Sequence, residues 1–258
     1  MIHFLTIVLD GLPWLAHIYP QLEKLDFDWS WRVVEGVAAN VKDTSWCKPL
    51  TPRLSEDGTT QYLDALAGYD PRVILYRKEL WNGKVAMVNE PLRTMYEPGL
   101  LFEMDSDELW SAEQIGKVHQ MFLNDPKKNC AYFRCDYRVG PRVRITNADG
   151  EHYGNHHAYE WKRVWRFSPG MRFKTHEPPV IENFQENAIK HEETARLGLV
   201  FVHQAYSTEK QIAFKEAYYP SCKGALEGWR KLQRNMRWPV DLKSFLPWVG
   251  EGVVVDRI

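Results

Sequence analysis

Short apolar runs alternate with amphipathic segments through the first half of the chain. Four of these runs predict strands, over residues 4–9, 31–37, 73–76 and 100–104. Between them, apolar residues spaced by three or four predict helices over residues 13–25 and 59–67. A further helix is predicted after Ser111, because Gln114 three residues later completes the pattern of a capping box. Strands separated by helices predict an α/β fold with a mostly parallel sheet flanked by helices.

The second half of the chain has a different pattern. Three further strands are predicted, over residues 131–139, 143–146 and 199–202. The first two are expected to pair antiparallel through the turn at Gly140–Pro141, and Thr208 with Gln211 predicts another capped helix. We therefore expect one continuous domain, in which residues 129–258 form a smaller, partly antiparallel portion beside residues 1–128.

Acidic residues follow the predicted strands of the first half. Asp10, Glu35 and Asp105 stand at or just after strand ends, and ligands of open α/β sheets bind beyond the carboxyl ends of the strands. Asp105 and Asp107 are spaced i, i+2, so both carboxylates face the same side of an extended backbone. Such oxygen ligands suit Mg²⁺ or Mn²⁺, which complete their shell with water and phosphate oxygens. The same D-x-D pattern also occurs in ordinary turns, because aspartate stabilises turns.

The order of the polar motifs resembles the nucleotide-binding half of family 2 glycosyltransferases of the GT-A type. Before the D-x-D strand stand Asp10-Gly11, Glu35, S-E-D-G-T at residues 55–59 and N-G-K at residues 82–84. The resemblance extends to V-H-Q-A-Y at residues 202–206. It implies a GT-A-type, Rossmann-like sheet whose first half, residues 1–128, binds a nucleotide-diphosphate sugar, while residues 129–258 bind the acceptor.

The resemblance also implies roles for individual residues. Nucleotide-sugar binding is expected of Asp10, Gly11, Glu35, Asp57, Lys84 and Asp105, and metal binding of Asp105, Asp107 and His203. Asp57 is expected to contact the base and Lys84 a phosphate; the alternatives are a turn-stabilising aspartate and an exposed lysine. The chain departs from the family in two respects: Glu35 stands where aspartate is more frequent, and no E-D pair marks a catalytic base.

Direct displacement at an anomeric carbon needs a carboxylate within reach of the acceptor hydroxyl. Glu160 is our candidate for this general base, because the rings on both sides of it in Y-E-W can pack on a sugar. A salt bridge from Glu160 to Lys162 or Arg163 is the alternative interpretation, and Asp136 and Glu177 are the other candidates for the base.

Aromatic side chains are unusually frequent, at 13% of the chain with 11 Trp. Flat rings suit the apolar face of a pyranose, although most of them fill the core of any protein. We assign Trp110, Tyr159 and Trp161 to acceptor binding.

Composition narrows the remaining possibilities. Charged residues make up 26% of the chain and the net charge is −1, without a basic stripe, so we expect no nucleic-acid partner. No apolar stretch is long enough to cross a bilayer, and four cysteines without a C-x-x-C motif predict free thiols in the cytoplasm.

The resemblance thus implies an inverting, non-processive transferase that uses Mn²⁺ or Mg²⁺ and passes a sugar to a glycan or another hydroxyl acceptor. One alternative is a non-catalytic carbohydrate-binding protein on the same fold. The other is a metal-dependent phosphoryl-transfer enzyme with Asp10 as nucleophile, although Leu12 stands where such enzymes need a second aspartate.

Overall fold

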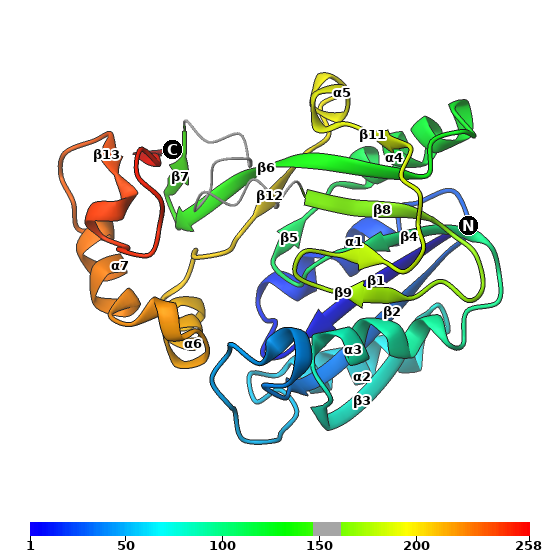
Figure 1. The fold of residues 1–258 in the computed structure, drawn as a ribbon, viewed down its shortest axis with the longest axis horizontal. Helices are drawn as coiled ribbons and strands as arrows, with labels where there is room; N and C mark the ends of the chain where they lie inside the picture. The colour runs from blue at the N-terminus through cyan, green and yellow to red at the C-terminus, as the bar shows by residue number, and fades with distance from the viewer. Residues whose placement is uncertain (147–160) are drawn as a thin grey trace.

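Four parallel strands form the centre of the fold, as the sequence predicts. In the computed structural model, which describes residues 1–146 and 161–258, β1 (Ile2–Val8) lies between β2 (Trp29–Ala38) and β4 (Gly99–Glu103). β3 (Val73–Trp81) pairs with the outer edge of β2. The strands run in one direction, so their carboxyl ends meet at one edge of the sheet (Figure 1).

An antiparallel portion continues the sheet beyond β4. There β8 (Trp161–Phe167) pairs with both β4 and β6 (Cys130–Gly140). The outer strands are β7 (Val143–Ile145), β14 (Val254–Arg257), β13 (Val240–Asp241) and β11 (Ala188–Ile189). The expected antiparallel pairing of residues 131–139 with 143–146 is confirmed in β6 and β7. Since β6 and β8 join β4 in one sheet, the two halves of the chain share a single sheet.

The short strand β12 joins segments that are distant in the sequence. β12 (Val200–His203) lies parallel to β6 on one side and antiparallel to β5 (Glu108–Leu109) on the other. A separate hairpin-like sheet pairs β9 (Phe173–Thr175) with β10 (Val180–Ile181).

Helices cover both faces of the parallel strands. Residues alternate between the two faces: Phe4 points into one core and Leu5 into the other, which explains why most positions of the central strands are apolar. One face is covered by η1 (Trp14–His17), α1 (Tyr19–Leu22), α2 (Thr59–Tyr69) and α4 (Ala112–Asn124). The other is covered by α3 (Lys84–Leu92).

The single helix expected over residues 13–25 is a 3₁₀ turn followed by one α-helical turn. Pro20 is the reason, because it has no N–H to donate to the preceding turn and is tolerated only where a helix begins. The capping boxes at Ser111 and Thr208 are both confirmed.

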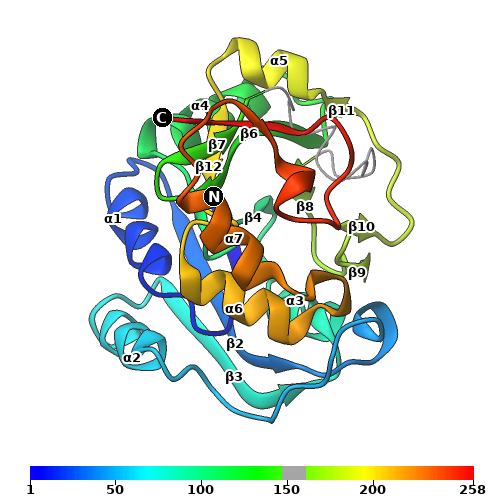
Figure 2. The ribbon, with the colours of Figure 1, turned by 90° about the vertical axis from the view of Figure 1, so that its left-hand side faces the viewer.

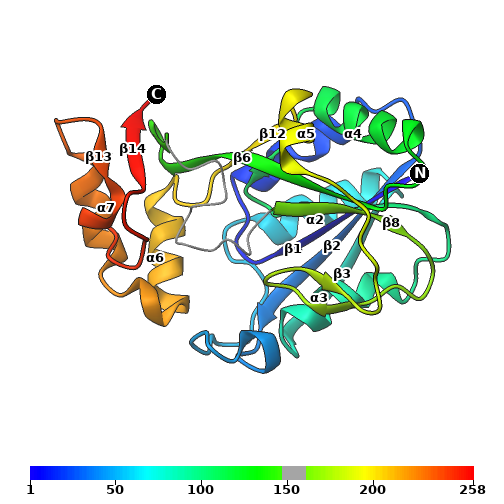
Figure 3. The same ribbon diagram turned by 45° about the horizontal axis from the view of Figure 1, so that its top comes forward.

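The C-terminal helices face the carboxyl edge of the parallel strands. Figures 2 and 3 show α6 (Glu209–Tyr218) and α7 (Ala225–Gln233) on that side of the sheet. The remaining short helices are η2 (Lys42–Thr44), α5 (His191–Arg196), η4 (Pro220–Cys222) and η5 (Leu242–Ser244). Within the described parts of the chain, no helix combines the length and apolar character that a bilayer crossing requires.

Candidate functional site

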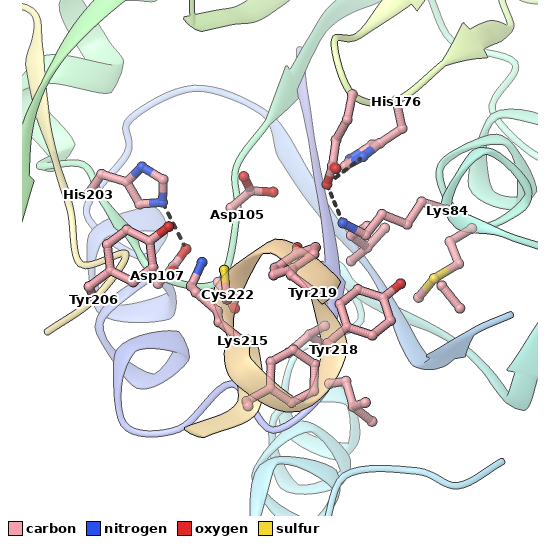
Figure 4. A pocket seen from close by; sticks show the side chains of 18 of the residues that line it. Lys84, Asp105, Asp107, His176, His203, Tyr206, Lys215, Tyr218, Tyr219 and Cys222 are labelled. Atoms are coloured by element: carbon pink, nitrogen blue, oxygen red, sulfur yellow. Dashed lines mark hydrogen bonds and ion pairs between the residues drawn. The ribbon is translucent and has the colours of Figure 1, made fainter. Parts of the chain in front are cut away.

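A cavity of about 770 Å³ opens between the carboxyl ends of the parallel strands and the C-terminal helices. Its floor comes from residues at the ends of β1, β2 and β4, including Leu9, Gly36 and Asp105. Its roof comes from α6 and the residues that follow it. Figure 4 shows Asp107 and His203 at one end, Lys84 and His176 at the other, and Asp105 between them.

Asp105 is held by a buried arginine. The Nη2 atom of Arg163, on β8, lies 2.9 Å from Asp105 Oδ2 and 2.5 Å from Glu108 Oε1. Arg163 Nε also donates to Glu108. A bidentate arginine is a strong, directional partner for carboxylates. Arg163 therefore fixes the loop of the D-x-D motif from the antiparallel side of the sheet.

Asp107 faces His203, and the strand pairing explains why. His203 ends β12, opposite Glu108 of β5 and beside Tyr137 of β6. Its Nε2 atom lies 3.5 Å from Asp107 Oδ1. Burial opposes ionisation of Asp107, but the attraction of His203 and Lys215 outweighs it and lowers its pKa to about 2. Asp107 is therefore a carboxylate at any physiological pH.

Lys215 places a cation beside this pair. Its ammonium group lies 4.8 Å from the centre of the Tyr206 ring. Burial by itself lowers the pKa of Lys215, but Tyr206, Tyr219 and Asp107 outweigh it, and the pKa is raised. The end of the cavity thus combines a carboxylate, an imidazole and a permanent ammonium group.

The Asp107–His203 pair fits a divalent ion that a substrate helps to hold. A carboxylate oxygen and an imidazole nitrogen are both ligands that Mn²⁺ accepts, and phosphate oxygens commonly complete such a shell. Within residues 1–146 and 161–258, no three His, Cys, Asp or Glu side chains converge on one point. Asp105 instead contacts Arg163, so of the three residues expected to bind the metal only Asp107 and His203 face each other.

The S-E-D-G-T turn is tied to the loop after β1. Asp57 accepts hydrogen bonds from the backbone N–H groups of Thr59 and Leu12 and forms an ion pair with Lys210 of α6. Asp10 forms an ion pair with Arg53, 2.6 Å between Nη2 and Oδ2. A second, smaller cavity of about 160 Å³ is lined by Asp10 and by Leu12 and Lys210, two partners of Asp57.

Gly11 lets this loop approach the D-x-D motif. A Cβ atom at Gly11 would lie 2.5 Å from Val8 Cγ2 and 3.3 Å from Ser106 Cβ. The 2.5 Å distance is shorter than real Cβ contacts, so a larger residue at position 11 would force Val8 or the loop to shift, whereas Ser106 would have to move by only a few tenths of an ångström. Glycine therefore fits this loop without displacing Val8.

Glu35 lies beneath the site rather than on its wall. It is 1% exposed, and its carboxylate accepts hydrogen bonds from Ser55 N–H, the Thr60 hydroxyl and Arg77 Nε. In this arrangement Glu35 positions the S-E-D-G-T turn.

A chain of alternating charges forms the other end of the cavity. Lys84, the first residue of α3, is paired with Glu177, and His176 Nε2 lies 2.8 Å from Glu103 Oε1. Burial by itself lowers the pKa of His176, but Glu103 and Glu177 raise it to about 10. Burial opposes ionisation of Glu177, yet Lys84 and His176 hold its pKa well below its usual range.

Glu177, one of the alternative candidates for the general base, thus lines the cavity as a permanent carboxylate. Asp136, the other alternative candidate, forms an ion pair with Arg138, and its Oδ2 atom lies 3.9 Å from Arg144 Nη1. Glu160 and Tyr159 fall outside the described residues, and Trp161 is placed only as the first residue of β8.

Trp110 lies in the hydrophobic core. It is 3% exposed, packs edge-on against Phe102 and Phe133 and stacks on Phe201. Because core rings already cover it, this placement does not support the expected role of Trp110 in acceptor binding.

Trp46 was not among the sequence candidates, yet it lines the cavity and is 49% exposed. Its ring stacks on Tyr219. Its position in a loop without periodic pattern gave no signal that separated it from the other tryptophans.

Comparison with known proteins identifies similar folds. No protein-family profile matches the sequence, and no curated protein matches it. Among solved structures, the mannosyltransferase PcManGT from Pyrobaculum calidifontis, in complex with GDP-Man and Mn²⁺, has a TM-score of 0.51 at 13% identity, over 96% of this chain and 67% of that one. Residues 1–349 of S. aureus TarS with UDP-GlcNAc give a TM-score of 0.40 at 14% identity, over 53% of this chain.

The chain spans 35% of the length of that TarS structure. The match to PcManGT, by contrast, covers nearly the whole of this chain, including both the parallel strands and the antiparallel portion. The chain therefore has a mostly parallel sheet flanked by helices, as its sequence predicts, and its fold is similar to that of PcManGT.

Proposed function

We propose that this protein is a metal-dependent glycosyltransferase that moves a sugar from a nucleotide-diphosphate sugar to an acceptor hydroxyl. The observation that carries the proposal is the Asp107–His203 pair with Lys215 beside it, on the wall of a cavity at the carboxyl edge of the parallel strands. The glycosyltransferase-like fold supports it. The structural neighbours bind UDP-GlcNAc and GDP-Man.

In this proposal the nucleoside lies at the smaller cavity beside Asp10 and Asp57, and the diphosphate lies between Lys215 and the Asp107–His203 pair. When bound by that pair, Mn²⁺ or Mg²⁺ supplies a Lewis acid that offsets the charge of the leaving diphosphate. Lys215, which lines the cavity, contributes a second positive charge from the protein itself.

Asp105 has a different part in the proposal from the one its motif implies. Its ion pair with Arg163 orients the D-x-D loop, so that Asp107 faces His203. Asp105, which follows the carboxyl end of β4, also lines the cavity. We therefore keep Asp105 as a donor-binding residue and assign the converging metal ligands to Asp107 and His203.

The transfer is a single displacement with inversion, and the enzyme is non-processive. The acceptor oxygen bonds to the anomeric carbon, the bond from that carbon to the diphosphate oxygen breaks, and the hydroxyl proton passes to a carboxylate. We keep Glu160 as the candidate for this base. The acceptor enters from the side of residues 129–258. We also propose a cytoplasmic location, because the four cysteines are free thiols.

The test is release of nucleoside diphosphate from a panel of nucleotide sugars, with Mn²⁺ and mixed hydroxyl acceptors. We expect the wild type and Asp28→Asn, an exposed control at the far end of β2, to release the product. Asp107→Asn is expected to release at least a hundredfold less. Equal release by Asp107→Asn and the control would refute the proposed site.

A further inference from the structure

One wall of the larger cavity is aromatic: Trp46 lines only this cavity, and Tyr219 lines both cavities. Trp46 follows η2, in the segment between β2 and α2, and stacks on Tyr219 with ring centres 5.3 Å apart and planes 13° from parallel. Its indole Nε1 donates to the Asp43 carbonyl at 2.9 Å. The ring is thus fixed both by its edge and by one face, while 49% of the residue remains exposed.

The segment that carries Trp46 is anchored to the roof of the cavity. The Lys48 N–H donates to the Tyr218 carbonyl at 2.8 Å, and the Lys48 ammonium group donates to the Glu216 carbonyl at 2.9 Å. Thr44 closes the turn before Trp46 through hydrogen bonds to the Ala39 and Val41 carbonyls. An anchored, half-exposed tryptophan loses little entropy when a ligand packs on it.

A carboxylate that accepts hydrogen bonds lies on the same cavity. Glu177 Oε1 takes the contacts from Lys84 and His176, and Glu177 itself lines the cavity with 25% of its side chain exposed. Lys84 lies 5.8 Å from the centre of the Tyr219 ring, so the ion pair and the aromatic wall adjoin. This combination suits a pyranose. Its C–H face can pack on a flat aromatic ring, and its hydroxyl groups can form hydrogen bonds with the charged groups.

We infer that Trp46, Tyr219 and Glu177 form a pyranose-binding subsite, with the sugar ring packed on Trp46 and a hydroxyl group donating to Glu177. The inference rests on the proposed function, which places the nucleoside at Asp10 and Asp57 and leaves this end of the cavity to a sugar. The pyranose comes either from the donor or from a glycan acceptor.

The test compares Trp46→Ala with Trp46→Tyr, which keeps a ring, and with Tyr96→Ala, an exposed aromatic residue that does not line the cavity. Dissociation constants are measured with Mn²⁺ for UDP, UDP-GlcNAc, GDP and GDP-Man. The protein is also titrated with a panel of methyl pyranosides and followed by NMR, with and without nucleotide. The titrations without nucleotide measure pyranose binding independently of nucleotide binding.

A donor-sugar subsite predicts that Trp46→Ala weakens a nucleotide sugar about tenfold, while the matching nucleoside diphosphate binds as before. An acceptor-sugar subsite predicts the same loss for a methyl pyranoside, with both donors unaffected. In either case Trp46→Tyr recovers most of the affinity and Tyr96→Ala changes nothing.

The inference is overturned if Trp46→Ala changes the dissociation constant of no pyranose ligand. It is also overturned if no pyranose ligand binds to the wild type. It is also overturned if the nucleoside diphosphate and its sugar weaken equally, because Trp46 would then bind the nucleoside. Failure of the proposed function gives a different result: the wild-type protein then binds no nucleoside diphosphate in the presence of Mn²⁺.

Discussion

Replacing Glu177 by glutamine tests the buried chain of charges that forms one end of the cavity. The substitution keeps the shape of the side chain but leaves Lys84 without its anion, and Lys84 is only 14% exposed. Removing one partner of a fully buried ion pair costs about 3–5 kcal/mol. Because Glu177 is 25% exposed, water can solvate part of the site, and we expect a loss of about 2 kcal/mol in the free energy of unfolding.

For a domain of this size, that loss lowers the melting temperature by about 4–8 °C. Thermal and urea unfolding at pH 7 measure it. The matched control is Lys84→Met combined with Glu177→Gln, which removes both charges and is expected to regain at least half of the lost stability. The reasoning is refuted if Glu177→Gln unfolds within about 0.5 kcal/mol of the wild type, or if the double variant is no more stable than the single one.

The pH dependence of stability provides a second observation on the same chain of charges. The folded-state pKa of His176 is raised to about 10 by Glu103 and Glu177, above its value of about 6.5 in an unfolded chain. Its stabilising contribution is therefore complete below about pH 6.5 and disappears as the pH rises through about 10. His176→Gln is expected to lose less stability on going from pH 7 to pH 10 than the wild type does, and an equal loss in urea unfolding at the two pH values would contradict this assignment.

Three further substitutions test other parts of the account. Asp107→Asn should abolish stabilisation by nucleoside diphosphate with Mn²⁺ while unfolding within about 1 kcal/mol of the wild type; persistence of that stabilisation would show that Asp107 is not a ligand. Asp70→Asn should lower the free energy of unfolding by about 1 kcal/mol at pH 7, because the partly exposed Arg72 lowers the pKa of the buried Asp70 to about 2. This difference from the wild type should disappear as the pH falls from about 4 through about 2. A difference that persists at pH 2 would speak against this ion pair as its cause. Glu160→Gln should keep donor binding and reduce transfer by roughly 10²–10⁴-fold, with an inverted product from the wild type; near-normal transfer would move the base to another carboxylate.

Much of the fold follows from patterns along the sequence. The strands β1, β2 and β4 are buried on both faces, so most of their positions are apolar, whereas only the start of the edge strand β3 is an apolar run. The capping boxes at Ser111 and Thr208 fix two helix starts through neighbouring residues alone. Helix α7 was not predicted, although Ala225, Trp229 and Leu232 have the spacing of a buried helical face.

The site was harder to predict, because its contacts join residues that are distant in sequence. Asp107 meets His203 only because β12 pairs with β5, and no local pattern encodes that pairing. The ion pairs of Asp105 with Arg163 and of Lys84 with Glu177 likewise depend on the register and placement of later segments. The candidate residues could be selected from the sequence, and the family resemblance grouped Asp107 with His203, but the partners of Asp105 and Lys84 required the fold.

The central claim is that Asp107 and His203 bind a divalent ion together with the diphosphate of a nucleotide. The most direct measurement is the thermal stability of the protein with UDP or GDP, in the presence of Mn²⁺ or of excess EDTA. At about 100 times the dissociation constant, binding should stabilise the protein by about 2.7 kcal/mol with Mn²⁺, a rise in melting temperature of about 5–10 °C, and by almost nothing in EDTA. Equal stabilisation in EDTA, or none from either nucleotide with Mn²⁺, would contradict the claim.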